Sequence, residues 1–316
     1  MPNRFTPGLA CAAWLAAGAA LAQPASTTVA PVTVQGLANP KMIEEQAQDF
    51  VQNHAASANP EIGQIGRWHD PVCVEVVGLP RADQAEVIKA RIESVAQAVG
   101  LPAARPGCRA NVEIVFNPQP QHVMDVVAKR REYLLGYYHF HDRNRLKTVI
   151  HPIQSWYVTS TSSFTVSMSP SGNPDPGRAP ANMMGVIDDP ENHSPAGCGQ
   201  TPAFSSCVRS AFENVFIVAD SRVLDGKTIG PVADEMAMLA LAKPRSLDGC
   251  GALASVIDAF AAAACPGRDR PDSLTPADAA YLTALYASDP EAKKAFAQSE
   301  IAGRMATILI KANQTR

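Results

Sequence analysis

Residues 210–245 read SAFENVFIVADSRVLDGKTIGPVADEMAMLALAKPR, an apolar segment followed by a turn and then by a second apolar segment. The first segment is rich in β-branched and aromatic residues, which favours a strand, and the second has the length and composition of a helix. One acidic pair, Asp234 and Glu235, interrupts the otherwise apolar helix. We expect the rest of the chain to assemble around this strand, turn and helix.

Further segments upstream have the composition of strands. The Val-rich run at 71–79 and the run at 110–116 flank a helical pattern that begins at Pro80, so together they predict a β-α-β unit. A longer β-branched and aromatic run covers 153–166. With 212–219, these segments predict an α+β fold, in which helices pack against a mixed sheet and the C-terminal part is helical.

Apolar residues recur at helical spacing in several other segments. The segment at 253–264 is rich in Ala and is predicted to be helical throughout. Thr275 followed by Pro276 is a strong signal for a helix start, because Thr caps the first turn and Pro fits its first position. The other predicted helices begin near residues 41, 122 and 289.

The first 22 residues match a secretory signal peptide. Arg4 supplies a positive charge, an Ala-rich apolar run follows, and Ala20-Leu21-Ala22 has the small-x-small pattern of a cleavage site. The apolar run is shorter than the about 20 residues that span a bilayer. We therefore predict cleavage after Ala22 and a periplasmic or secreted protein that is not an integral membrane protein. A membrane anchor and lipidation at Cys11 are the alternatives.

The predicted mature chain has a leader and one domain. Residues 23–40 have no apolar period and predict a flexible leader, and residues 41–313 predict a single α+β domain. Within that domain, residues 168–207 are so rich in Pro and Gly that they predict a long loop.

The cysteines that remain after signal cleavage are even in number, which indicates disulfides in an oxidising compartment. They fall into pairs that are close in sequence, and the chain has no CxxC motif that would favour a metal site. We predict the bridges Cys73–Cys108, Cys198–Cys207 and Cys250–Cys265.

Charge and motifs argue against several classes of function. The formal net charge is −3, whereas general nucleic-acid binding requires an excess of Lys and Arg. Gly226-Lys227-Thr228 resembles the end of a phosphate-binding loop, but Ser221 stands where that motif requires its first Gly. The chain has no GxSxG elbow, and a free nucleophilic Cys is not expected when all the mature cysteines can pair.

Histidines and basic residues gather between residues 129 and 151. If His139 and His141 lie on a strand, their side chains face the same way, and His151 offers a third ligand for zinc. The surrounding positive charge opposes a cation, so we favour a basic surface that meets an anionic partner. That surface comprises Lys129, Arg130, Arg131, Arg143, Arg145 and Lys147.

The acidic pair lies on a helix that follows a strand, which is the order found in zinc metallopeptidases of the HExxH type. In those enzymes two histidines hold zinc and the Glu between them is the general base. When the chain is aligned on Glu235, Asp234 and Met238 stand in place of the two histidines.

The region from about Phe212 onward, with VADEMAMLALAKPRSLDGC, LTPADAAYLTALY and IAGRM, resembles uncharacterised secreted bacterial proteins with a zincin-like core that lacks the HExxH motif. The resemblance implies a zincin-like C-terminal half and a pseudoenzyme, and it implies no peptidase activity.

Two functions remain open at this point. We favour a non-catalytic envelope protein that binds a protein partner or an anionic ligand, without a cofactor and without nucleic acid. The alternative is an atypical metal-dependent hydrolase that uses Glu235 as its base and His139, His141 and His151 as zinc ligands. In a simpler interpretation, Glu235 caps or pairs near the helix start while Met236 and Met238 fill the core.

Overall fold

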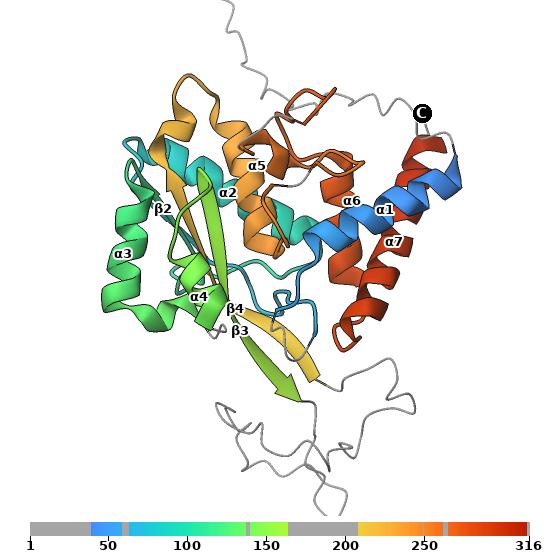
Figure 1. Cartoon of the computed structure of the whole chain (residues 1–316), viewed down its shortest axis with the longest axis horizontal. Helices are drawn as coiled ribbons and strands as arrows, with labels where there is room; N and C mark the ends of the chain where they lie inside the picture. The colour runs from blue at the N-terminus through green and yellow to red at the C-terminus, as the bar shows by residue number, and fades with distance from the viewer. Residues whose placement is uncertain are drawn as a thin grey trace, which may run out of the picture. The chain divides into compact units, whose positions relative to one another are not determined.

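The computed structural model describes residues 39–58, 63–136, 140–163, 208–248, 250–261 and 265–314 (Figure 1). They form an α+β fold with a mixed sheet and a helical C-terminal part, which confirms the predicted fold class. Residues 1–38 and 164–207 lie outside the described residues, so the predicted signal peptide, most of the leader and the long loop stay predictions.

The sheet has the strand order β1-β2-β4-β3. Strands β1 and β2 are parallel, as are β2 and β4, whereas β3 runs antiparallel to β4. Each strand overlaps one of the segments that the sequence predicts. Their bounds are Val74–Val77 for β1, Val112–Asn117 for β2, Ile153–Ser163 for β3 and Val208–Asp220 for β4.

Helices cover both faces of the sheet. Alternate residues of a strand point to opposite faces. Val215 and Ile217 of β4 belong to the larger core with α2 and α5, whereas Phe216 and Val218 form a smaller core with Met124 of α3. Strand β4 is therefore buried on both faces. The covering elements are α2 (Ala82–Ala98), α3 (Pro120–Arg130), the 3₁₀ turn η1 (Glu132–Leu135), α4 (Phe140–Leu146) and α5 (Ile229–Leu241).

The larger core extends away from the sheet to three more helices. Helix α1 packs against α7, and α7 packs against α6 (Figure 1). The predicted N-cap is confirmed, because the Thr275 side chain accepts from the backbone N–H of Asp278 and the Asp278 side chain accepts from that of Thr275. The bounds are Pro40–His54 for α1, Pro276–Ala287 for α6 and Lys294–Gln314 for α7. No described helix is both long enough and apolar enough to cross a membrane.

Two helix predictions were wrong. The described part of the Ala-rich segment 253–264 contains only a 3₁₀ turn, η3 (Val256–Ala259), which starts at a capping box between Ser255 and Asp258. The last helix begins at Lys294 and not at residue 289. There, the side chain of Asp289 accepts from the backbone N–H of Glu291 and closes a turn before the helix.

Two of the predicted disulfides are present. Cys73, just before β1, is bonded to Cys108, with a Cα–Cα distance of 6.1 Å. Cys250 is bonded to Cys265, with a Cα–Cα distance of 5.4 Å. Cys198 and Cys207 lie outside the described residues. Each observed bridge closes a loop and restricts the unfolded chain, which stabilises the fold by about 2–4 kcal/mol.

Candidate functional site

The two acidic residues of α5 have different surroundings. Asp234 forms an ion pair with Arg91 of α2 and accepts a hydrogen bond of 2.9 Å from the backbone N–H of Leu274. Its carboxylate therefore joins α5 to α2 and to the start of α6. These partners give Asp234 a structural role.

Glu235 is enclosed in the core. Its exposed fraction is 2%, and its Oε2 atom has no hydrogen-bond partner. Burial raises the pKa of its carboxyl group well above the ordinary value, and the carboxylates of Asp258 and Asp278 raise it further. A general base has to reach the proton that it removes, and a carboxyl group with so little exposure is not placed to do so. The neighbouring Met236, Met238, Leu239 and Leu241 are fully buried, as the simpler interpretation predicts.

The histidine cluster is only partly visible. His141 lies on helix α4 (Phe140–Leu146). The prediction that His139 and His141 both lie on a strand was therefore wrong for His141. His139 and the side chain of His141 lie outside the described residues. The Nδ1 atom of His151 lies 3.5 Å from the Asp248 carboxylate. Among the described residues no group of three His, Cys, Asp or Glu side chains is placed to hold a metal ion, and the three-histidine set stays a prediction.

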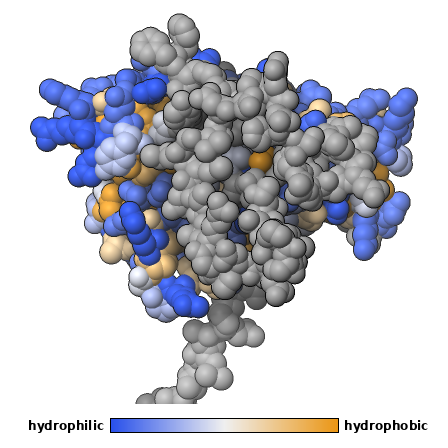
Figure 2. Space-filling view, turned by 90° about the horizontal axis from the view of Figure 1, so that it is seen from below, coloured by the Kyte–Doolittle hydropathy of each residue, from blue (hydrophilic) through white to orange (hydrophobic). Residues whose placement is uncertain are grey.

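The predicted basic residues belong to α3, α4 and the segments that follow them. Glu132 lies among them, with its carboxylate 3.0 Å from Lys147 Nζ and 3.7 Å from Arg143 Nη1. Lys147 lowers the pKa of Glu132, and Arg143 adds to this effect. Figure 2 shows hydrophilic side chains at the end of the molecule where α3 lies, interrupted by small apolar areas. Part of the positive charge of this surface is therefore already compensated, and its binding role stays a prediction.

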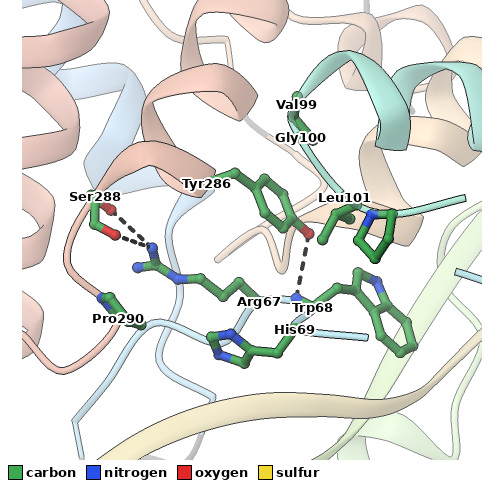
Figure 3. A pocket seen from close by; sticks show the side chains of 10 residues that line it. Arg67, Trp68, His69, Val99, Gly100, Leu101, Tyr286, Ser288 and Pro290 are labelled. Carbon is green, nitrogen blue, oxygen red and sulfur yellow. Dashed lines mark hydrogen bonds between the residues drawn. The ribbon is translucent and has the colours of Figure 1, made fainter. Parts of the chain in front are cut away.

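A pocket of about 230 Å³ lies away from all of these predicted residues (Figure 3). One wall is the segment 67–69, which precedes β1. A second wall is the end of α2 with Leu101 and Pro102, and a third is the end of α6 with Ser288 and Pro290.

Arg67 is the central feature of this pocket. Its exposed fraction is 3%, and its Nη1 atom donates to Leu285 O at 2.6 Å, to Ser288 O at 2.8 Å and to Ser288 Oγ at 3.1 Å. A cation at the carbonyl end of a helix is favourable, so these bonds also stabilise the end of α6. The Nε atom is buried and has no hydrogen-bond partner in the described part of the chain. Arg67 makes no ion pair with any described carboxylate.

His69 lies beside Arg67 in the pocket wall (Figure 3). Its Nε2 atom is buried and has no hydrogen-bond partner. Burial lowers the pKa of its imidazole, and the positive charges of Arg209 and Arg67 lower it further. The ring is therefore neutral at pH 7, with one nitrogen that can donate and one that can accept.

The rest of the pocket is held rigidly. The indole Nε1 of Trp68 donates to Ala240 O at 2.7 Å, and the Tyr286 hydroxyl donates to Leu241 O at 2.9 Å. The backbone N–H of Trp68 donates to that hydroxyl at 3.4 Å. These bonds tie segment 67–69 and α6 to the end of α5. The side chains in the pocket are therefore positioned before any ligand enters.

Comparisons with protein-family models, curated proteins and solved structures return no match to this chain.

Gly66 sets the course of the pocket segment. A Cβ atom at this position would lie 2.6 Å from Cε1 of Phe212 and 2.9 Å from Cβ of Ala58. We expect Gly66→Ala to lower the free energy of unfolding by about 1–3 kcal/mol, because the buried Phe212 ring has to move. Urea unfolding with the disulfides intact measures this.

The matched control is Gly303→Ala in α7, where no atom lies within 4 Å of the added Cβ. This change is expected to stabilise the helix by about 0.5–1 kcal/mol. Equal stability of the two variants would contradict the close packing at Gly66.

Proposed function

We propose that this protein is an exported, disulfide-stapled binding protein whose pocket at Arg67 takes a small anion. The two observed disulfides are compatible with an oxidising compartment. A periplasmic or secreted location after cleavage at Ala22 is part of the proposal, as is a zincin-like scaffold in which Asp234 and Met238 stand where a peptidase has zinc ligands.

The observation that carries the proposal is the buried guanidinium of Arg67. An ionised group that leaves water loses several kcal/mol of solvation, and a buried charge is normally paired. Among the described residues, the carbonyls of Leu285 and Ser288 at the end of α6 compensate one nitrogen, and the Nε atom has no acceptor. An anion in the pocket supplies that acceptor and neutralises the charge.

Catalysis is not part of the proposal. The pocket wall holds no Ser, Thr or Cys beside a base, because Ser288 Oγ is engaged with Leu285 O at 2.9 Å and with Arg67. Glu235, the base of the alternative hydrolase, is buried on α5, where burial raises the pKa of its carboxyl group, and it is not among the pocket-lining residues. A binding role is what remains for a rigid pocket with one buried cation.

The test measures the unfolding temperature of the oxidised mature protein with formate, sulfate or inorganic phosphate, at an ionic strength held constant with sodium chloride. We expect at least one of these anions to raise the unfolding temperature by about 3–5 °C at roughly ten times its dissociation constant. Arg67→Met is expected to abolish the rise, because the substitution removes the positive charge and keeps most of the side-chain volume.

Ser288→Ala is the matched control. It removes one hydrogen bond from Arg67 Nη1 but keeps the guanidinium, so its response to anions should stay close to that of the unmodified protein. If none of the three anions acts beyond chloride, or if Arg67→Met responds fully, the pocket is not an anion site.

A further inference from the structure

The free edge of the Arg67 guanidinium determines which anion fits. Nη1 is engaged with Leu285 O and with two oxygens of Ser288. Nε has no partner, and no hydrogen bond from Nη2 to a described residue is present. The edge formed by Nε and Nη2 presents two parallel N–H donors, which is the geometry that binds both oxygens of a carboxylate.

The charge of the pocket favours an anion with one negative charge. Arg67 is the only cationic side chain among the residues that line it, because His69 is neutral at pH 7. The carboxylates of Asp289 and Glu300 act on Arg67 from outside the lining, and Arg209 and Asp70, which carry opposite charges, act on His69. Within the lining, Arg67 can neutralise one negative charge but not the second, which inorganic phosphate carries for much of the time at neutral pH.

The remaining walls carry several apolar side chains beside Tyr286 and Ser288, and the volume is small. Trp68 and Leu101 lie on one side, opposite Pro290 (Figure 3), and Pro102 also lines the pocket. The volume of about 230 Å³ is below the roughly 300–1,000 Å³ of pockets that hold drug-sized ligands. A compact body of several carbon atoms fits these walls, and the unpartnered Nε2 of His69 can add a hydrogen bond to the acid group.

We infer that the ligand is a small monocarboxylate with a compact apolar body, bound side-on by Nε and Nη2 of Arg67 and by Nε2 of His69. The inference rests on the proposed anion-binding function and specifies its ligand class.

Isothermal titration calorimetry at pH 7 tests this with benzoate, benzamide and inorganic phosphate as probes. Benzamide has the shape of benzoate without its charge. We expect benzoate to bind at least about tenfold more tightly than benzamide, because charge-assisted hydrogen bonds are stronger than neutral ones. Benzoate should also bind more tightly than phosphate.

Two variants locate the binding. Arg67→Lys keeps the positive charge but removes the two-donor edge, and we expect it to weaken benzoate binding at least about tenfold. His69→Ala should weaken it by a smaller factor, about threefold to tenfold, because it removes one hydrogen bond to a charged acceptor. The comparison of benzoate with benzamide uses the unmodified protein, so it tests the carboxylate inference even if Arg67→Lys does not fold.

The outcomes separate the two claims. If phosphate binds and benzoate does not, the carboxylate inference fails and the anion-binding function stands. If no anion binds, both fail. If benzamide binds as well as benzoate, or Arg67→Lys binds benzoate unchanged, the side-on carboxylate contact is wrong.

Discussion

Replacing Asp278 with alanine is expected to lower the free energy of unfolding by about 3–5 kcal/mol, the largest loss among the substitutions considered. Asp278 has an exposed fraction of 0%, and its carboxylate accepts from Ser255 Oγ at 2.6 Å and from the backbone N–H of Val256 at 2.8 Å. It also accepts from the backbone N–H and the hydroxyl of Thr275, both at 2.9 Å. Alanine leaves the Ser255 hydroxyl and the backbone N–H groups of Val256 and Thr275 buried without this acceptor, whereas the Thr275 hydroxyl can still donate to Ala254 O.

Urea unfolding followed by circular dichroism, with the disulfides intact, measures the loss. Asp272→Ala is a control with the same change of charge, because Asp272 is exposed and lies only a few residues before α6. A surface substitution of this kind changes stability by less than about 0.5 kcal/mol. Similar stability of the two variants would show that the Asp278 network does not hold η3 and α6 together.

Replacing Glu235 with methionine is expected to stabilise the protein increasingly as the pH rises. The folded state raises the pKa of Glu235 above 4.5, first through burial and then through Asp258 and Asp278, with Lys227 opposing them. The folded state therefore holds this proton more tightly than the unfolded state. The stability that Glu235 contributes is present below about pH 4.5 and is lost as the pH rises towards its folded pKa.

The size of this effect follows from linkage. Across that window the unmodified protein loses about 1.4 kcal/mol per pH unit through Glu235, and Glu235→Met removes this slope. Burial raises the pKa values of Asp258 and Asp278 too, so both proteins keep a shared part of the pH dependence. The difference between the two proteins isolates Glu235.

Urea unfolding at several pH values from 5 to 8 gives this difference. Glu44→Met, at an exposed position of α1, is the matched control and should show a difference from the unmodified protein that hardly varies with pH. A constant difference for Glu235→Met would mean that Glu235 is ionised in the core throughout.

The sheet was predictable from the sequence because each strand contains a run of β-branched or aromatic residues, although β1 is shorter than its predicted segment and β4 begins earlier, at Val208. In β4, residues 215–219 are all apolar, which is what burial on both faces requires. The Ala-rich segment 253–264 misled the prediction because local helix propensity was overridden by tertiary contacts. Asp278 draws Ser255 and Val256 into its network, and Arg270 Nη1 donates to Ala259 O at 2.8 Å.

The pocket could not be predicted, because its contacts join residues that are far apart in the chain. Arg67 is separated by 218 positions from Leu285 and by 221 from Ser288. No periodicity marks segment 67–69, since it is neither a helix nor a full strand. One feature of the sequence could have indicated the pocket. Gly66 is followed directly by Arg67, Trp68 and His69, which place a cation and two aromatic rings where the backbone is closely packed.

The packing of α1 on α7 has a consequence for the timing of folding. The hydroxyl of Tyr281 donates to His54 O at 2.7 Å, and Gln298 Nε2 donates to Ala55 O at 3.0 Å, across 227 and 243 positions. During synthesis, α1 emerges long before these partners exist, and contacts between distant residues form late because their loops are costly to close. The native core is therefore completed only when nearly the whole described chain has been made. If the protein is exported, as we propose, a nascent chain that remains unfolded until then stays suited to threading through a secretion channel.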